Sequence, residues 1–548
     1  MRIGERAAAG LHWLSLHPLL SLTLVLAAQV LPSLDVKDVW MPDEARHAAV
    51  FRNLWEGGHW LVLHLGDAAY ADKPPVYFWL LAGLAWLTGS TGPALFMLAA
   101  ALSGWGLLAV MVHAGWRLGV EPRTVLLAGL ILLTNWFFIE RAHQPRMDLL
   151  FSAFILLAEA ALFRATTGAD PASLRLAPML AAGLAMGAAT LTKGPLGIAM
   201  PLAALALYLI WQRRTRSLAS PAMAACLAVV AGIGLAYLAG VIATEGWAFV
   251  RTVAVDQLWT RAVASVDLSE PAYAYLPMLA VALLPWTPAL IWALLRKART
   301  LGWASFWPPV AQGDSARGYL YACVIGPLAV ISAMDYKIAF LLVPLLAPLA
   351  LILATEITDL PDRDRRWLFA GITAVLALAA ALAPFAPALT LWPAHVTGAP
   401  LVAGGLAVTA GLALSAHRRG ALRFGVMLAL GVTLTLLPLY RITMQGLNGV
   451  MSPRALATVI AEHAAKGHAV AEYDPAYTGH FDYHAGVILT ALRAPPALAA
   501  FGQKPCGLVV MRARLQAWAT PPALTIAAEA QLDAATYRVL VWGDETCR

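Results

Sequence analysis

The chain has 548 residues, of which 60% are apolar and 13% charged, and its mean hydropathy is +0.70. This composition excludes a soluble globular protein, because apolar runs of membrane-spanning length recur through the first 440 residues. The net charge of +7 does not indicate nucleic-acid binding, since no basic stripe with interleaved aromatic residues accompanies it.

The apolar runs predict an all-α polytopic membrane protein. About thirteen of them approach the roughly 20 residues that cross a bilayer. A further apolar stretch, residues 75–87, is short and rich in aromatic residues, so we expect it to lie at the membrane interface. The expected centres of the crossing helices lie near residues 24, 104, 131, 156, 183, 202, 231, 285, 325, 346, 376, 407 and 431.

Loop charges predict the orientation of these helices. With the N-terminus in the cytoplasm, the loops on that side hold 19 basic and 8 acidic residues. The opposite loops before residue 441 hold 10 basic and 14 acidic residues. This asymmetry follows the positive-inside rule. We therefore expect a cytoplasmic N-terminus and a C-terminal region on the other side of the membrane.

Residues 441–548 have a different pattern and predict a small soluble α/β domain, because short alternating apolar runs and Gly/Pro turns replace the long spans. A helix is expected at 452–467, and strands at 469–472, 507–511 and 537–542. Cys506 and Cys547 lie here, where a compartment outside the cytosol permits a disulfide; two unpaired thiols are the alternative. Cys226 and Cys323 lie in spans and are expected to be packed apolar residues.

Charged residues on the outer side form short clusters beside the spans, where charge is costly and therefore often functional. Asp43 and Glu44 follow a proline at the expected start of a helix, and capping explains one acid more readily than two. Lys73 precedes two prolines that fix the backbone. Its alternatives are a phosphate-binding cation and a snorkelling interfacial lysine.

Further clusters follow along the chain. The short outer loop 140–148 holds five ionisable groups, and Asp148 directly adjoins a span. Lys193 stands before Gly-Pro, which opens the backbone at membrane depth, a feature tolerated where it lines an enclosed or wet cavity. Lysines and arginines that converge with carboxylates at one membrane face suit a ligand with a phosphate and a lipid tail. A transporter of lipid-linked substrates and a non-catalytic scaffold are the alternatives; a transporter more often carries repeats and mid-membrane charges.

These motifs, in this order, resemble the signatures of bacterial GT-C glycosyltransferases, in particular the aminoarabinose (lipid A) transferases and their relatives in the protein mannosyltransferase superfamily. Two departures stand out: His47 occupies a position where that family usually has tyrosine, and the segment around Lys337 keeps one lysine where two are usual. The motifs read Asp43-Glu44-Ala-Arg46-His47, Lys73-Pro-Pro-Val-Tyr77-Phe-Trp, Arg146-x-Asp148, Leu191-Thr-Lys193-Gly-Pro195 and Gln257-Leu-x-x-Arg261.

The resemblance implies a GT-C transmembrane domain at 1–440, with a first periplasmic loop at 35–74, and a periplasmic α/β domain at 441–548. It also implies an inner-membrane enzyme that moves a sugar from a polyprenyl-phosphate donor to a periplasmic acceptor. Lipid A is the first expectation for that acceptor, ahead of another lipid or polysaccharide and of protein hydroxyls. No cofactor is expected, and no ligand spacing demands a divalent metal, although the carboxylates leave room for one.

Site roles follow from the same resemblance. Asp43 matches the catalytic aspartate of the first loop, and it would deprotonate a hydroxyl acceptor or orient a phosphate acceptor. Lys73 matches the lysine near the donor phosphate, and a single displacement with inversion is implied. The expected catalytic residues are Asp43, Glu44 and Asp148; the donor phosphate would meet Lys73, Arg261, Lys193 and Lys337; Arg46, His47, His143, Arg146 and Tyr77 are further cavity candidates.

Overall fold

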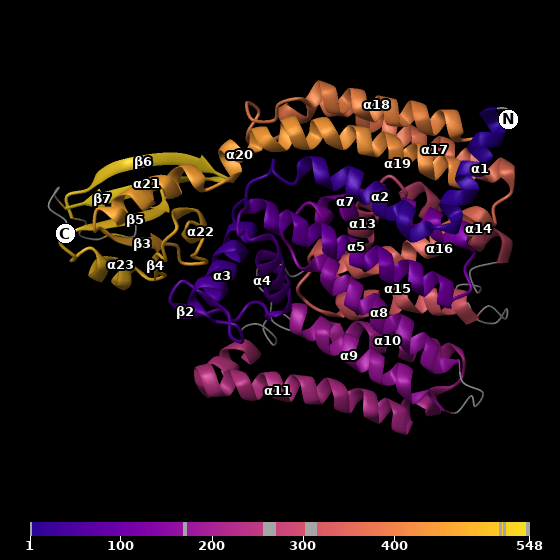
Figure 1. Ribbon diagram of the computed structural model, residues 1–548, viewed down its shortest axis with the longest axis horizontal. Coiled ribbons are helices and arrows are strands. Elements are labelled where there is room, and N and C mark those ends of the chain that lie inside the picture. Colours follow the sequence, from indigo (N-terminus) through magenta and orange to yellow (C-terminus); the bar gives the residue numbers. More distant parts are fainter. Residues whose placement is uncertain are drawn as a thin grey trace.

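A helical bundle and a small sheet domain lie at opposite ends of an elongated molecule, with the N-terminus on the bundle and the C-terminal end on the sheet domain (Figure 1). The structure is a computed structural model. It describes residues 3–167, 173–255, 270–301, 315–514, 518 and 522–543. The predicted Arg261 and Cys547 lie outside these described residues.

Within the described ranges, nine helices are long and apolar enough to cross a membrane, and three bent helix pairs raise the number to twelve. A shorter apolar helix, α10, covers the remaining predicted centre, so all thirteen centres fall within or between these helical segments. The elements of the bundle are α1 (Ile3–Leu16), α2 (Pro18–Val30), η1 (Leu31–Ser33), α5 (Pro93–Arg117), α6 (Pro122–Leu133), α7 (Trp136–Ala142), α8 (Asp148–Thr166), α9 (Leu176–Lys193), α10 (Leu196–Trp211), η2 (Thr215–Ala219), α11 (Pro221–Thr252), η4 (Ala272–Ala274), α13 (Tyr275–Ala282), α14 (Thr287–Leu301), α15 (Ser315–Ala333), η6 (Ala339–Leu345), α16 (Leu346–Thr358), α17 (Asp362–Leu382), η7 (Ala383–Leu389), α18 (Ala399–Ala416), α19 (Ala421–Pro438), η8 (Leu439–Met444) and α20 (Gln445–Met451).

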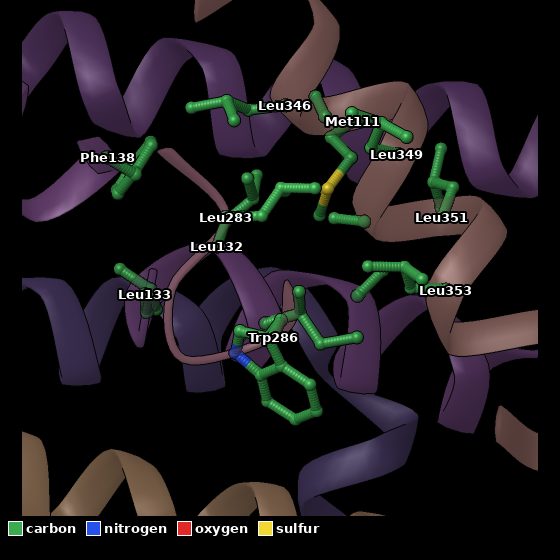
Figure 2. Close-up of a cluster of buried hydrophobic side chains, with 14 of the residues drawn as sticks. Met111, Leu132, Leu133, Phe138, Leu283, Trp286, Leu346, Leu349, Leu351 and Leu353 are labelled. Carbon is green, nitrogen blue, oxygen red and sulfur yellow. The ribbon is translucent and has the colours of Figure 1, made fainter. Parts of the chain in front are cut away.

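The core of the bundle surrounds the link between α13 and α14. Figure 2 shows Leu283 and Trp286 of this link among apolar side chains of α5, α6, α7 and α16. The indole of Trp286 is fully buried and donates a hydrogen bond to Thr134, 2.9 Å away. Asn135 caps α7 by accepting from the Phe138 amide. These contacts fix the break between α6 and α7. The last residues of α7 and the turn that follows it form the charged segment 140–148.

The first outer loop and the apolar stretch after it form two helices and a short hairpin. Asp43 and Glu44 occupy the first turn of α3, where the helix dipole favours acidic side chains. The predicted interfacial stretch is α4, whose 13 residues fall short of the roughly 20 that a crossing needs. Its interfacial placement stays a prediction. The elements are α3 (Asp43–Gly57), β1 (His64–Leu65), β2 (Ala68–Ala69) and α4 (Val76–Thr88).

The C-terminal region contains the expected helix and strands. Its five-stranded sheet has the order β4-β3-β5-β7-β6, in which β3 runs parallel to β4 and β5, and β7 runs antiparallel to β5 and β6. The preceding run of α19, η8 and α20 stays helical through Met451, so the sheet domain starts at α21. Its elements are α21 (Arg454–Ala465), β3 (Ala469–Tyr473), α22 (Asp482–Ala485), β4 (Thr490–Leu492), α23 (Pro495–Phe501), β5 (Gly507–Arg512), β6 (Thr525–Leu532) and β7 (Ala535–Trp542).

The cysteines fall into two groups. Cys226 and Cys323 are free and buried in the bundle, as the apolar sequence around them predicts. Cys506 is disulfide-bonded. Its predicted partner is outside the described residues, but a bonded Cys506 agrees with a domain in a compartment that permits disulfides.

Polar contacts attach the sheet domain and the preceding helix α20 to the segment just before α3. Asp38 accepts hydrogen bonds from the Arg454 guanidinium at 2.7 and 2.9 Å and from the Ser452 hydroxyl at 2.7 Å. Asn448 accepts from the indole of Trp40 at 2.7 Å. Side chains of α3, α4, α21 and the sheet also share one apolar core. The sheet domain is therefore joined to the loop that carries Asp43, and not to the bundle alone.

Candidate functional site

Three segments distant in sequence bring four charged side chains together at one end of the bundle. Asp43 lies in the first turn of α3, and Asp148 in the first turn of α8. Lys193 is the last residue of α9, before Gly194, whose φ of 96° turns the chain. Acids at helix starts and a base at a helix end match the helix dipoles. Local folding therefore directs all three toward the same place.

Arg146 connects the two acids. Its Nη1 lies 2.6 Å from Asp43 Oδ2, and its Nε lies 3.1 Å from Asp148 Oδ2. The other oxygen of Asp148 pairs with Lys193. The side chain of Asp148 is 2% exposed, whereas that of Asp43 is 35% exposed. Asp148 is therefore a buried counter-ion, and Asp43 is the acid that a ligand can reach.

Two guanidinium groups hold Asp43 in its ionised form. Arg46 Nη2 lies 2.7 Å from Asp43 Oδ1, opposite the contact from Arg146. Burial acts to raise the pKa of Asp43, but the charges of Arg46 and Arg146 outweigh it and bring that pKa below its usual value. Asp43 is thus a carboxylate at neutral pH and a weak proton acceptor.

The sheet domain contributes an aromatic ring to this site. The guanidinium carbon of Arg46 lies 4.5 Å from the ring centroid of Tyr477, in the loop between β3 and α22. A cation over an aromatic face is attracted by the ring's electrons. Tyr477 is half exposed, so part of its ring stays available beside Asp43. It is not among the predicted site residues, because no charge or spacing distinguishes it in the sequence.

Lys73 lies close enough to His47 for its charge to act on that ring. Its Nζ lies 2.9 Å from Asp72 Oδ2, an oxygen that also accepts from the hydroxyl of Tyr70 at 3.1 Å. Lys73 is therefore held in place, as the following prolines suggest, and Asp72 is the residue that holds it.

His47 and Tyr77 place unpaired polar atoms inside the site. Burial, together with the nearby cations Arg46 and Arg146, lowers the pKa of His47 to about 3, so the ring is neutral. Its Nδ1 lies 3.3 Å from the Pro145 carbonyl. Among the described residues, neither His47 Nε2 nor the Tyr77 hydroxyl finds a hydrogen-bond partner, although both are buried. Such atoms are usually satisfied by a ligand or water.

Glu44, a predicted catalytic residue, contacts the segment before α3. Its carboxylate pairs with Lys37, and both side chains are buried. It also accepts a hydrogen bond from the Trp40 amide at 3.1 Å. Glu44 thus fixes the segment that precedes α3, next to Asp43 in sequence. Lys37 is not a predicted site residue, because its partner lies seven positions away in a segment with no helical periodicity.

Two other predicted candidates, His143 and Lys337, form their contacts with neighbouring segments of the bundle. His143 stacks on Tyr440 with ring centroids 4.1 Å apart, and its Nδ1 lies 2.8 Å from the Ile139 carbonyl. Lys337 donates to the Met334 carbonyl. The segment of Lys337 reaches the site through Phe340, whose ring centroid lies 3.9 Å from the Arg146 guanidinium carbon. Phe340 is absent from the predicted set, since an apolar residue beside a span carries no functional signal.

The described residues contain no group of three or more His, Cys, Asp or Glu side chains arranged to hold a metal ion. The site is a group of cations around three carboxylates. Lys73, Arg46, Arg146 and Lys193 supply four positive charges to Asp43, Asp72 and Asp148. It can bind an anionic group such as phosphate next to an exposed carboxylate.

The sequence of this chain matches a known family of membrane transferases. Residues 72–239 match the model of the dolichyl-phosphate-mannose-protein mannosyltransferases. The undecaprenyl phosphate-α-4-amino-4-deoxy-L-arabinose arabinosyl transferase 1 of Sodalis glossinidius is 30% identical over 73% of this chain and 71% of its own. The corresponding transferase of Erwinia tasmaniensis is 27% identical over 66% of this chain and 65% of its own, slightly less than two thirds of that relative.

Solved structures agree on the fold. The crystal structure of ArnT from Cupriavidus metallidurans in the apo state matches with a TM-score of 0.77 and 20% identity, and covers 98% of each chain. The structure of the same protein bound to undecaprenyl phosphate matches with a TM-score of 0.74, over 94% of this chain and 96% of that one. The predicted GT-C fold is therefore confirmed. Because it is 30% identical to the Sodalis relative over more than two thirds of both chains, this chain belongs to the family of the undecaprenyl phosphate-α-4-amino-4-deoxy-L-arabinose arabinosyl transferases, which are membrane glycosyltransferases.

Proposed function

We propose that this protein transfers 4-amino-4-deoxy-L-arabinose from undecaprenyl phosphate to a phosphate group of lipid A. The donor and the sugar are those named for its relatives. The acceptor rests on the chemistry of the site and on the family resemblance. Residues 1–440 would form the transmembrane catalytic domain and 441–548 a periplasmic region, in which the end of η8 and α20 lead into the sheet domain at α21. The N-terminus would lie in the cytoplasm, as the loop charges favour.

The observation that carries the choice of acceptor is the state of Asp43. An acceptor hydroxyl needs a base whose pKa lies near the working pH. Arg46 and Arg146 hold the pKa of Asp43 below its usual value, which makes it a poor base. A phosphate acceptor is already anionic and needs none. The surrounding cations would neutralise it, so a phosphate acceptor fits this site better than a protein or polysaccharide hydroxyl.

The reaction would proceed as one displacement. An oxygen of the acceptor phosphate attacks the anomeric carbon, a new carbon–oxygen bond forms, and the bond from that carbon to the donor phosphate breaks. Undecaprenyl phosphate leaves with the electron pair, and its developing charge is stabilised by Lys73 and the neighbouring cations. Asp43 orients the sugar or the acceptor, and Asp148 keeps Arg146 and Lys193 in place. Inversion at the anomeric carbon follows from a single displacement.

Reconstitution of the full chain tests this function. In proteoliposomes that contain the aminoarabinose donor and lipid A, we expect undecaprenyl phosphate and modified lipid A to form in equal amounts. Mass spectrometry measures both products. Lipid A without its phosphates should give neither product. A transporter would move the donor across the membrane without releasing undecaprenyl phosphate, so the absence of release would overturn the proposal. Release with a hydroxyl acceptor alone would reassign the acceptor.

The Lys73→Ala variant tests the donor site. Loss of a charged contact to phosphate costs roughly 1.5–3 kcal/mol, so we expect the KM for the donor to rise about 10-fold or more. Lys73→Arg should recover most of the affinity because it keeps the charge. The control is Lys466→Ala, which removes an exposed lysine at the end of α21. If the Lys73→Ala variant bound the donor as tightly as the wild type, Lys73 would be an interfacial lysine that extends its ammonium group toward water and does not bind the donor phosphate.

A further inference from the structure

A second charged region lies at the end of the bundle away from the sheet domain. The chain runs from α19 through α20 into the sheet domain, so the connection from α18 to α19 lies at the opposite end (Figure 1). There the start of α17 and the residues after α18 line a cavity of about 530 Å³ that is open to the surface. Its lining residues are Asp362, Arg363, Arg366, Trp367, Ala370, His417 and Arg418.

The cavity has an excess of positive charge. Arg363, Arg366 and Arg418 face it with one acid, Asp362, and that acid pairs with Arg365. Within the described ranges, none of the three lining arginines forms an ion pair. Guanidinium groups bind phosphate through paired hydrogen bonds, so three of them around one cavity favour an anionic phosphate ligand.

The spacing on α17 presents these residues as one face. Positions 363, 366, 367 and 370 recur at intervals of three and four, which places them side by side on a helix. Arg363 and Arg366 therefore point the same way as Trp367, whose side chain is 64% exposed. Exposed tryptophan in a membrane helix is favoured at the level of the lipid headgroups. The arginines thus lie where headgroup phosphates are found.

The apolar flank of the same helix favours a lipid over a soluble anion. Leu378 and Leu382, further along α17, are both more than half exposed. α17 with η7 is one of the candidate membrane spans, and so is α18. A phospholipid with its phosphate in the cavity would lay its acyl chains along this surface. Inorganic phosphate would use the arginines alone.

We propose that this cavity binds the phosphate headgroup of an anionic phospholipid from the adjacent leaflet. Basic pockets between transmembrane helices at the arginine-rich side recognise such headgroups. The site is separate from the Asp43 cluster and does not depend on the proposed sugar transfer. Arg363, Arg366 and Arg418 contact the phosphate, and Trp367 packs at the boundary between headgroup and acyl chains.

Native mass spectrometry of the purified full chain tests the proposal, with titration of phosphatidylglycerol, phosphatidylcholine and inorganic phosphate. We expect the first phosphatidylglycerol to bind at least fivefold tighter than phosphatidylcholine. The triple variant R363Q/R366Q/R418Q should lose that preference. The control R175Q/R213Q/R216Q removes the same charge from three exposed arginines that do not line the cavity, at the start of α9, between α10 and η2, and in η2. It should keep the preference.

Three results would overturn the lipid site. An equal loss in both triple variants would mean that general surface charge attracts the lipid. No preference in the wild-type chain would remove the site altogether, and displacement of phosphatidylglycerol by millimolar inorganic phosphate would identify a soluble anion site. Thermal unfolding of both triple variants within a few degrees of the wild type shows that each is folded. The W367A variant tests the contribution of the indole separately, and we expect it to bind phosphatidylglycerol about threefold more weakly.

Discussion

The Asp43→Asn variant will fold normally and lose sugar transfer, with kcat/KM reduced by about 10²-fold or more, as expected when a group that orients the reactants is lost. Asparagine keeps the shape of the side chain but removes the charge that Arg46 and Arg146 contact at 2.7 and 2.6 Å. Because Asp43 is the exposed acid of the cluster, that change acts on the bound ligand and less on packing. Transfer of labelled sugar in proteoliposomes measures the loss, and thermal unfolding measures the fold.

The matched control is Glu56→Gln on the same helix. Glu56 lies in the last turn of α3 and pairs with Arg52 at 2.8 Å, and its side chain is largely exposed. An exposed pair of this kind contributes at most about 1 kcal/mol. We expect normal transfer from Glu56→Gln. Turnover of Asp43→Asn close to that of this control would remove Asp43 from the mechanism.

The spans could be predicted because each is a local property of the sequence. A run such as α5 or α19 needs only its own apolar residues to be recognised. The three bent pairs could not be predicted in the same way. The break between α6 and α7 depends on Thr134 and Asn135, which bond to Trp286 and to the Ala282 carbonyl far along the chain. Such contacts are set by tertiary packing.

Four residues of the charged cluster could be predicted to lie at one face, but their pairing could not. Counting loop charges places Asp43, Arg146, Asp148 and Lys193 at one membrane face, and the structure brings these four together. Which cation meets which acid depends on the angles of three helices. Arg146 joins Asp43 across 103 positions, a relation that no local pattern contains.

Residues without charge were missed for a different reason. Tyr477 and Phe340 act through aromatic faces that contact Arg46 and Arg146. In a chain with 9% aromatic residues, one more tyrosine or phenylalanine is no signal.

Asp72 is charged and was also not predicted. It adjoins Lys73 in sequence, yet its role emerges only because the same carboxylate oxygen contacts both Lys73 and Tyr70.

Arg146 is the position where stability and activity should fall together. Arg146→Met removes the shared partner of Asp43 and Asp148, and Asp148 is almost fully buried. Breaking a buried ion pair costs about 3–5 kcal/mol. We expect the lower end of that range in the free energy of unfolding, because Lys193 still pairs with Asp148 and Arg46 with Asp43. Unfolding by sodium dodecyl sulfate titration measures the change.

Arg146→Lys separates the two effects. Lysine keeps the positive charge but cannot span two carboxylates with a planar group. We therefore expect most of the stability to return while transfer stays reduced, since Asp43 is no longer held from two sides. Arg538→Met is the control: it removes an exposed arginine that pairs with Glu529 in the sheet domain, a contact that contributes at most about 1 kcal/mol. If Arg146→Met were as stable and as active as Arg538→Met, Arg146 would be a surface contact and Asp43 would need another means of staying ionised.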